Sequence, residues 1–95
     1  MMEDTLFKQF KDILDTDNVT GCVLADNHGL CLLSSPNISH ETAGIVSAIA
    51  QYASKIEPDN SNPVICLEGT KRQCLIKNEN SITSAIFKNE VNENT

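Results

Sequence analysis

Residues 39–56, SHETAGIVSAIAQYASKI, form the stretch around which the rest of the chain is organised. Ser39 is suited to cap a helix, because its hydroxyl oxygen can accept an otherwise unpaired amide two or three residues on. Lys55 lies in the expected last turn and Pro58 follows soon after, so the helix should end near residue 56. At about 100° per residue its apolar side chains cover an arc of roughly 220°, whereas a surface helix has an apolar stripe little wider than ~100°. We expect a long helix that needs a second packing partner besides one sheet.

The apolar arc of this helix divides into two stripes. The first is made mostly of small side chains that allow close approach, namely Ala43, Val46, Ala50 and Ala53. The second is bulky and consists of Ile45, Ile49, Tyr52 and Ile56, with Ala48 at one end of the arc. The pattern leaves open which stripe faces the chain's own sheet and which faces another chain, and a helix fully buried in one domain is the alternative. Placing a charge in the arc, as in Ile49→Asp, is expected to break the fold or the assembly.

Length and charge narrow the classes of function. Ninety-five residues make one domain, expected over residues 3–88, and the polar residues 89–95 are expected to form a disordered tail. A small core of Ile, Leu, Val and Ala buries limited area, so help from oligomerisation is expected. The net charge of −6 and the scattering of the seven Lys and Arg residues argue against nucleic acid as a partner. No apolar run approaches the ~20 residues of a membrane span, so direct membrane insertion is not expected.

The cysteines and histidines show no pattern typical of a metal or catalytic site. Cys22, Cys31, Cys66 and Cys74 lie in strand-like apolar runs and lack C-x-x-C spacing, so we expect free, buried thiols in a cytoplasmic protein. A metal site built from Cys22, His28, Cys31 and His40 is the alternative, and no known ligand spacing supports it. No glycine-rich phosphate loop or nucleophile elbow occurs. We therefore predict no catalytic residue, no metal and no cofactor.

The other elements follow from hydrophobic periodicity and turn residues. One apolar face of a short helix over residues 4–15 is formed by Leu6, Phe7, Phe10, Ile13 and Leu14. Strands are expected at residues 19–25, 30–34, 64–68, 73–77 and 82–88. The order α-β-β-α-β-β-β, with short hairpins between most strands, predicts an α+β domain with a five-stranded antiparallel sheet and the long helix on one face. The edge strands of that sheet would be left for a partner to pair.

Two classes of function remain beside catalysis. A scaffold would bind another protein through the surplus helix stripe and a sheet edge. A small-ligand sensor would enclose a pocket between helix and sheet. With three Phe, one Tyr and no Trp, and with few central polar groups, the residues favour the scaffold.

The chain also resembles a known family. Motifs in the family's order and spacing are Asp4-Thr5-Leu6, Val23-Leu24, Asp26, Gly29-Leu30, Ala43-Gly44-Ile45, Ala50-Gln51 and Pro63-Val64-Ile65-Cys66-Leu67-Glu68. Over roughly residues 2–88 the chain is similar to the small roadblock-type subunits of the Ragulator complex, members of the roadblock/LC7 family. No single motif is diagnostic, and the specificity comes from their order. Cys31 and the Asn-rich tail depart from the pattern without affecting the expected fold.

The resemblance implies the roadblock fold, in which two domains pair through their long helices and edge strands. Together with the surplus stripe, it points to an interface at Ile45, Ala48, Ile49, Tyr52, Ile56, Val64, Ile65, Cys66 and Leu67. The implied partners are another small roadblock-type subunit, with a homodimer in isolation as an option, and a larger lipid-anchored subunit that wraps the pair at the lysosomal surface. Such an assembly recruits Rag GTPases for amino-acid signalling to the TOR kinase. A dynein light chain or a GTPase-regulatory subunit of another assembly is the alternative.

Overall fold

The computed structural model describes residues 2–56, 58–59 and 63–89. Its elements are α1 (Met2–Leu14), β1 (Val19–Asp26), β2 (Cys31–Ser34), α2 (Glu41–Ile56), β3 (Val64–Glu68), β4 (Arg72–Glu79) and β5 (Ile82–Asn89). The Ser39 hydroxyl accepts the amide of Glu41 at 3.0 Å, which confirms the predicted cap of the long helix. Asn89, assigned to the tail from sequence, belongs to β5, and its amide donates to the carbonyl of Asn18 at 2.9 Å. The rest of the predicted tail lies outside the described residues.

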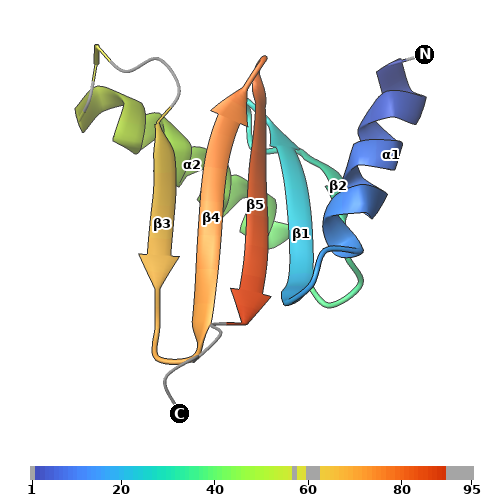
Figure 1. The fold of residues 1–95 in the computed structure, drawn as a ribbon. Coiled ribbons are helices and arrows are strands. Elements are labelled where there is room, and N and C mark those ends of the chain that lie inside the picture. The colour runs from blue at the N-terminus through green and yellow to red at the C-terminus, as the bar shows by residue number, and fades with distance from the viewer. Residues whose placement is uncertain (1, 57, 60–62, 90–95) are drawn as a thin grey trace.

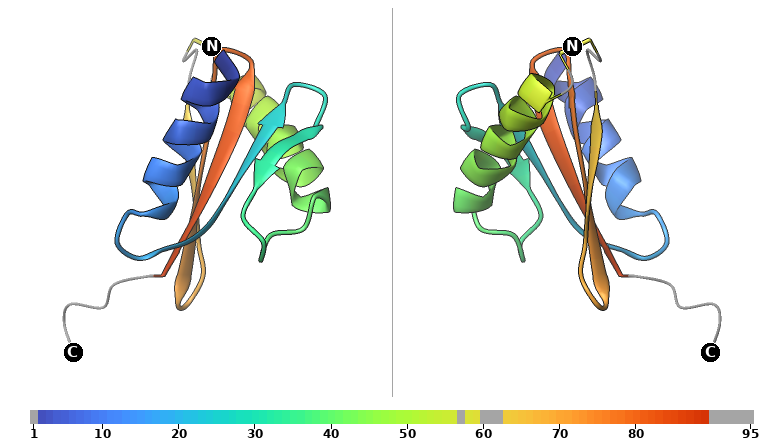
Figure 2. Two further views of the ribbon diagram at one scale, coloured as in Figure 1. Left: turned by 90° about the vertical axis from the view of Figure 1, so that its right-hand side faces the viewer. Right: turned by 90° about the vertical axis from the view of Figure 1, so that its left-hand side faces the viewer.

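The strands form one antiparallel sheet in the order β2-β1-β5-β4-β3 (Figure 1). Three pairs are hairpins between consecutive strands, and the pairing of β1 with β5 joins the first hairpin to the strands that follow α2. Edge-on views show α1 on one face of the sheet and α2 on the other (Figure 2). This confirms the predicted α+β class and leaves β2 and β3 at the two edges.

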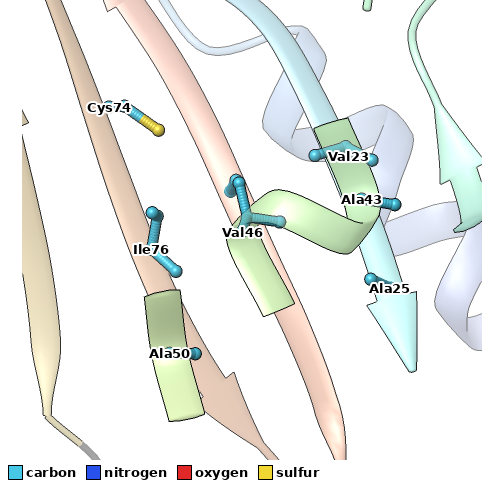
Figure 3. Close-up of a cluster of buried hydrophobic side chains, with 8 residues drawn as sticks. Val23, Ala25, Ala43, Val46, Ala50, Cys74 and Ile76 are labelled. Carbon is cyan, nitrogen blue, oxygen red and sulfur yellow. The ribbon is translucent and has the colours of Figure 1, made fainter. Parts of the chain in front are cut away.

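The small stripe of α2 packs on the sheet. A core cluster contains Ala43, Val46 and Ala50 from α2 and Val23, Ala25, Cys74, Ile76 and Ala85 from the strands (Figure 3). The small side chains of this stripe let the helix backbone come close to the strands. The small stripe, rather than the bulky one, therefore packs on the sheet. Ser47, which lies outside the apolar arc of the helix, is also buried and donates to the carbonyl of Asp26 at 3.3 Å.

The opposite face of the sheet is covered by α1. Phe10 is buried there against Cys22 and Leu24 of β1. Phe7, predicted on the same packing face, is 51 % exposed, and Lys11 Nζ lies 5.7 Å from the centre of its ring. That prediction is wrong: the cluster under α1 is formed with Cys22 and Leu24 of β1 and with Leu33, Ile82 and Ile86 of β2 and β5, and Phe7 lies outside it.

The turn between β1 and β2 holds α2 in position. Asp26 Oδ1 accepts the amides of Leu30 at 2.9 Å and His28 at 2.8 Å, and these bonds hold the pKa of Asp26 below its usual range. Gly29 has a φ of +83°, and a Cβ placed on it would lie 3.1 Å from the Cα of Gly44 in α2. Helix and turn therefore meet backbone to backbone, which only glycine at this position permits without strain.

Candidate partner interface

The bulky stripe of α2 lies on the outer surface. Ile45, Tyr52 and Ile56 are 59 %, 67 % and 77 % exposed. Ala48 is exposed as well, whereas Ile49 is half-buried because it also packs against the core cluster. Single exposed apolar residues are common, but a row of large ones on one helix is typical of an interaction surface. The alternative of a helix fully buried within one domain is therefore wrong.

The open edge of β3 is the second part of the candidate site. Within the described residues β3 pairs with β4 and has no strand on its other side. Ile65 and Leu67 stand opposite Ile76 and Cys74, which belong to the core under α2, so both side chains are on the α2 face of the sheet. Ile65 is half-buried and Leu67 is 46 % exposed.

The other side chains of β3 point to the opposite face. Val64 is 62 % exposed and Cys66 is exposed, although the sequence predicted a buried thiol at Cys66. The prediction failed because an edge strand has a neighbour on one side only, and because α1 covers β1 rather than β3. Figure 1 shows the C-terminal end of α2 beside the β3 edge, so stripe and edge form neighbouring surfaces.

A hollow of about 330 Å³ adjoins this surface on the strands. Its apolar lining comes from Leu67 of β3, Cys74 of β4 and Phe87 of β5, and no α2 residue lines it. Sequence analysis missed Cys74 and Phe87 as parts of this site. Alternation along β4 and β5 would place them on the α2 face, but only the pairing of Leu67 with Cys74 and of Cys74 with Phe87 brings all three together.

A second hollow, of about 460 Å³, bears on the sensor alternative. It lies between α2 and the strands and is lined by Asn27, Ala50, Gln51, Ser54, Pro63 and Asn78. Its amide groups bind one another: Gln51 Nε2 donates to the carbonyl of Asn27 at 2.9 Å, and Asn78 Nδ2 donates to Asn27 Oδ1 at 3.4 Å. Ligand pockets are usually mainly apolar with a few converging polar groups, and this polar hollow does not fit that description.

The four residues of the alternative metal site do not converge. Cys22 belongs to the cluster under α1, whereas Cys31 packs against the cluster under α2, so the two thiols are on opposite faces of the sheet. Among the described residues no group of three or more His, Cys, Asp or Glu side chains is placed to hold a metal ion. Within the same residues, neither helix is long and apolar enough to cross a membrane.

The cysteines are expected to react at very different rates with an aromatic disulfide reagent at pH 8. Cys66 is exposed and should react first. Burial raises the pKa of Cys22 to about 11, so about one molecule in a thousand carries its thiolate at that pH, and the thiolate is the reactive form. Burial also raises the pKa of Cys74. A time course with peptide mass mapping measures these rates.

The control for this experiment is Cys66→Ser, which should remove the fast phase and leave the rest unchanged. Adding denaturant should expose Cys22 and Cys74. Fast labelling of Cys22 in the folded protein would contradict the burial described here.

A five-stranded antiparallel sheet with a long helix on one face defines the roadblock class. The fold matches that of MglB from Myxococcus xanthus, with a TM-score of 0.71 and 17 % identity over 88 % of this chain and 78 % of that one. It also matches a Roadblock/LC7 domain from Streptomyces avermitilis, with a TM-score of 0.68 and 13 % identity over 81 % and 71 % of the two chains.

Sequence comparison narrows the class to one family. A family model described as Ragulator complex protein LAMTOR5 matches residues 2–88. A LAMTOR5 homolog from Nematostella vectensis is 36 % identical over 88 residues, which cover 92 % of this chain and 97 % of the relative. Ragulator complex protein LAMTOR5 from Xenopus tropicalis is 31 % identical with the same coverage. The chain belongs to the LAMTOR5 family of Ragulator complex proteins.

Proposed function

We propose that this chain is a non-catalytic scaffold subunit of a Ragulator-like complex. It pairs with another small roadblock-type subunit through the bulky stripe of α2 and the open edge of β3. The observation that carries the proposal is that three large apolar side chains of one helix are each more than half exposed. The C-terminal end of the same helix lies beside β3, which has no strand on its other side within the described residues (Figure 1). The proposed interface residues are Ile45, Ala48, Ile49, Tyr52, Ile56, Val64, Ile65, Cys66 and Leu67.

Energetics favour the use of both surfaces together. Fully burying one large apolar side chain contributes about 1.5–3 kcal/mol. Three partly exposed residues on α2 thus contribute on the order of 5 kcal/mol, which only matches the lower end of the ~4–15 kcal/mol that association costs. Hydrogen bonds along the β3 edge and burial of Val64 and Leu67 supply the additional binding free energy that the helix stripe alone does not provide. A partner that covers the helix but not the edge would bind weakly.

Membership in the LAMTOR5 family of Ragulator complex proteins supports a role in a larger assembly. We propose that a larger lipid-anchored subunit wraps the roadblock pair and holds it at the lysosomal surface, with the unassembled chain in the cytoplasm. The complete complex recruits Rag GTPases and thereby supports amino-acid signalling to the TOR kinase. In this arrangement the chain provides a binding surface for its partners and does not catalyse a reaction.

The pairing is tested by co-expressing the chain with a small roadblock-type Ragulator subunit and measuring molar mass by light scattering. The expected result is a stable one-to-one complex whose mass is the sum of the two chains. A chain that remains at 10.4 kDa in the presence of such subunits would refute the proposal.

The cellular role is tested separately, by locating a tagged chain in cells. It should be found at lysosomes, and it should leave them when the lipid-anchored subunit is depleted. Unchanged lysosomal localisation after that depletion would contradict tethering by a partner.

A further inference from the structure

The bulky stripe of α2 contains one polar group, the hydroxyl of Tyr52, and a lysine lies beside it. We infer that Tyr52 and Lys55 select the partner of this chain, because together they require a carboxylate on the partner surface that faces them. The inference rests on the proposed function, since it takes the stripe as the pairing surface. It adds the chemistry that the partner must present there.

Tyr52 lies inside the stripe rather than at its rim. Its side chain is 67 % exposed, with Ile45 about two turns before it and Ile56 about one turn after it. The residue one turn before it on the same face is the small Ala48, and helical side chains lean toward the preceding turn. A partner surface that covers both isoleucines therefore also covers the ring between them and removes its hydroxyl from water.

The hydroxyl of Tyr52 needs a hydrogen-bond partner once it is covered. Within the part of the chain that the structure describes, Tyr52 contacts the Lys55 cation through its ring, and its hydroxyl has no hydrogen-bond partner. In the free chain water takes that place. Covering the hydroxyl without a hydrogen-bond acceptor would weaken binding by about 5- to 150-fold. The stripe therefore discriminates between partners that offer an acceptor and partners that do not.

Lys55 places a positive charge at the same point of the stripe. Its Nζ lies 5.5 Å from the centre of the Tyr52 ring, and residues three positions apart are neighbours on a helix surface. Lys55 is the only basic residue of α2 and forms no ion pair with any residue that the structure describes. A cation here also suits the last turn of the helix. Because it repels a cationic donor, the hydroxyl is left to donate.

A carboxylate is the partner group that fits both residues. A partner surface made of a helix or of the face of a sheet has its backbone carbonyls already paired, so a side chain must accept the bond. A carboxylate accepts hydrogen bonds only, and a charge-assisted bond is roughly twice as strong as one between neutral groups. The same negative charge attracts Lys55. An amide or hydroxyl side chain would accept the bond but would leave the lysine without a counter-charge.

The helix itself does not provide this carboxylate. Glu41 is the only acidic residue of α2, and it precedes Tyr52 by eleven residues, or ~16 Å along the helix axis. The acceptor must therefore come from the partner chain.

The first test is calorimetric titration of Tyr52→Phe against the small roadblock-type Ragulator subunit used in the co-expression experiment. This change keeps the ring and its contact with Lys55 and removes only the hydroxyl. We expect at least about a tenfold loss of affinity, because a hydrogen bond to a charged group is lost. Circular dichroism and the urea midpoint should match those of the wild-type protein, since the side chain is exposed in the free chain.

The charge is tested with Lys55→Met, which keeps an unbranched side chain. We expect about a two- to fivefold loss of affinity at 0.15 M salt, and a smaller loss at 1 M salt, where the Debye length is about 3 Å. Lys11→Met is the matched control. Lys11 Nζ also lies over an aromatic ring, 5.7 Å from the centre of Phe7, but on α1. Its removal should leave the affinity unchanged.

The partner's carboxylate is located by a double-mutant cycle. Each Asp and Glu of the partner subunit is replaced by Ala in turn, and every variant is titrated with the wild-type chain and with Tyr52→Phe. One replacement should weaken binding to the wild-type chain by about tenfold or more and should weaken binding to Tyr52→Phe much less. Independent losses at every acidic position would overturn the requirement for a carboxylate.

The outcomes keep this inference separate from the proposed function. A wild-type chain that pairs with the subunit, together with a Tyr52→Phe protein of equal or higher affinity, would overturn selection by Tyr52 and leave the proposed function intact. A wild-type chain that pairs with no small roadblock-type subunit would overturn the proposed function, and this inference with it.

Discussion

Val46→Asp is expected to unfold the protein. Val46 is 3 % exposed and packs in the cluster under α2, where no cation is placed to pair with a carboxylate among the cluster's residues. Burying an unpaired charge costs several kcal/mol, so we expect a loss of more than about 4 kcal/mol from a total stability on the order of 5–15 kcal/mol. Urea unfolding followed by circular dichroism at 222 nm measures the change.

The control for this prediction is Val46→Ala, which removes volume without adding charge. It should cost about 1–3 kcal/mol and leave the protein folded. A folded Val46→Asp protein with nearly wild-type stability would show that this side of α2 does not face the sheet.

Ile45→Asp is expected to leave the fold intact and abolish partner binding. Ile45 is the neighbour of Val46 in sequence, but its side chain is 59 % exposed on the bulky stripe. Exposed substitutions usually change stability by no more than about 0.5 kcal/mol. At an interface, loss of a large anchor costs about 2 kcal/mol or more, which corresponds to at least about a 30-fold weaker complex. Calorimetric titration against a roadblock-type partner measures the affinity.

Phe7→Asp is the matched control on the other face. Phe7 is an apolar residue of similar exposure, 51 %, on α1. The Phe7→Asp protein should bind the partner with the same affinity as the wild-type protein. If Phe7→Asp weakened binding as much as Ile45→Asp, the interface would not be confined to α2 and β3.

The Ile49→Asp change expected from sequence to be disruptive is less informative than this pair. Ile49 is half-buried and packs on the core cluster while it also borders the exposed stripe. Its replacement would disturb stability and binding together. Val46→Asp and Ile45→Asp separate the two effects because the helix turns them toward opposite environments.

Much of the fold could be predicted from hydrophobic periodicity and turn residues. The long helix, its Ser39 cap, the order of the elements and the antiparallel sheet are confirmed. These features depend on residues close together in sequence. A hydrophobic period near 3.6 residues indicates a helix, a period of 2 indicates a strand, and residues such as Gly29 indicate turns. The pairing of β1 with β5 depends on residues distant in sequence and could not be read in this way.

The differences between predicted and observed burial have one common cause. Phe7 and Cys66 were predicted to be buried and are exposed, whereas Ser47, which is polar and lies outside the apolar arc of α2, is buried. Polarity describes a side chain, but burial depends on what stands opposite it. Ser47 finds the carbonyl of Asp26, while Phe7 and Cys66 lie beyond the cover that neighbouring elements provide.

Helical periodicity is a local property of the chain, so the sequence already shows that the long helix has more apolar surface than one sheet can cover. Which stripe is left over depends instead on how the helix packs against the folded sheet. The small residues Ala43, Val46 and Ala50 pack on the sheet because they allow close approach, and Gly29 against Gly44 sets the rotation of the helix. Ile45, Tyr52 and Ile56 are consequently exposed on the outer side of the helix.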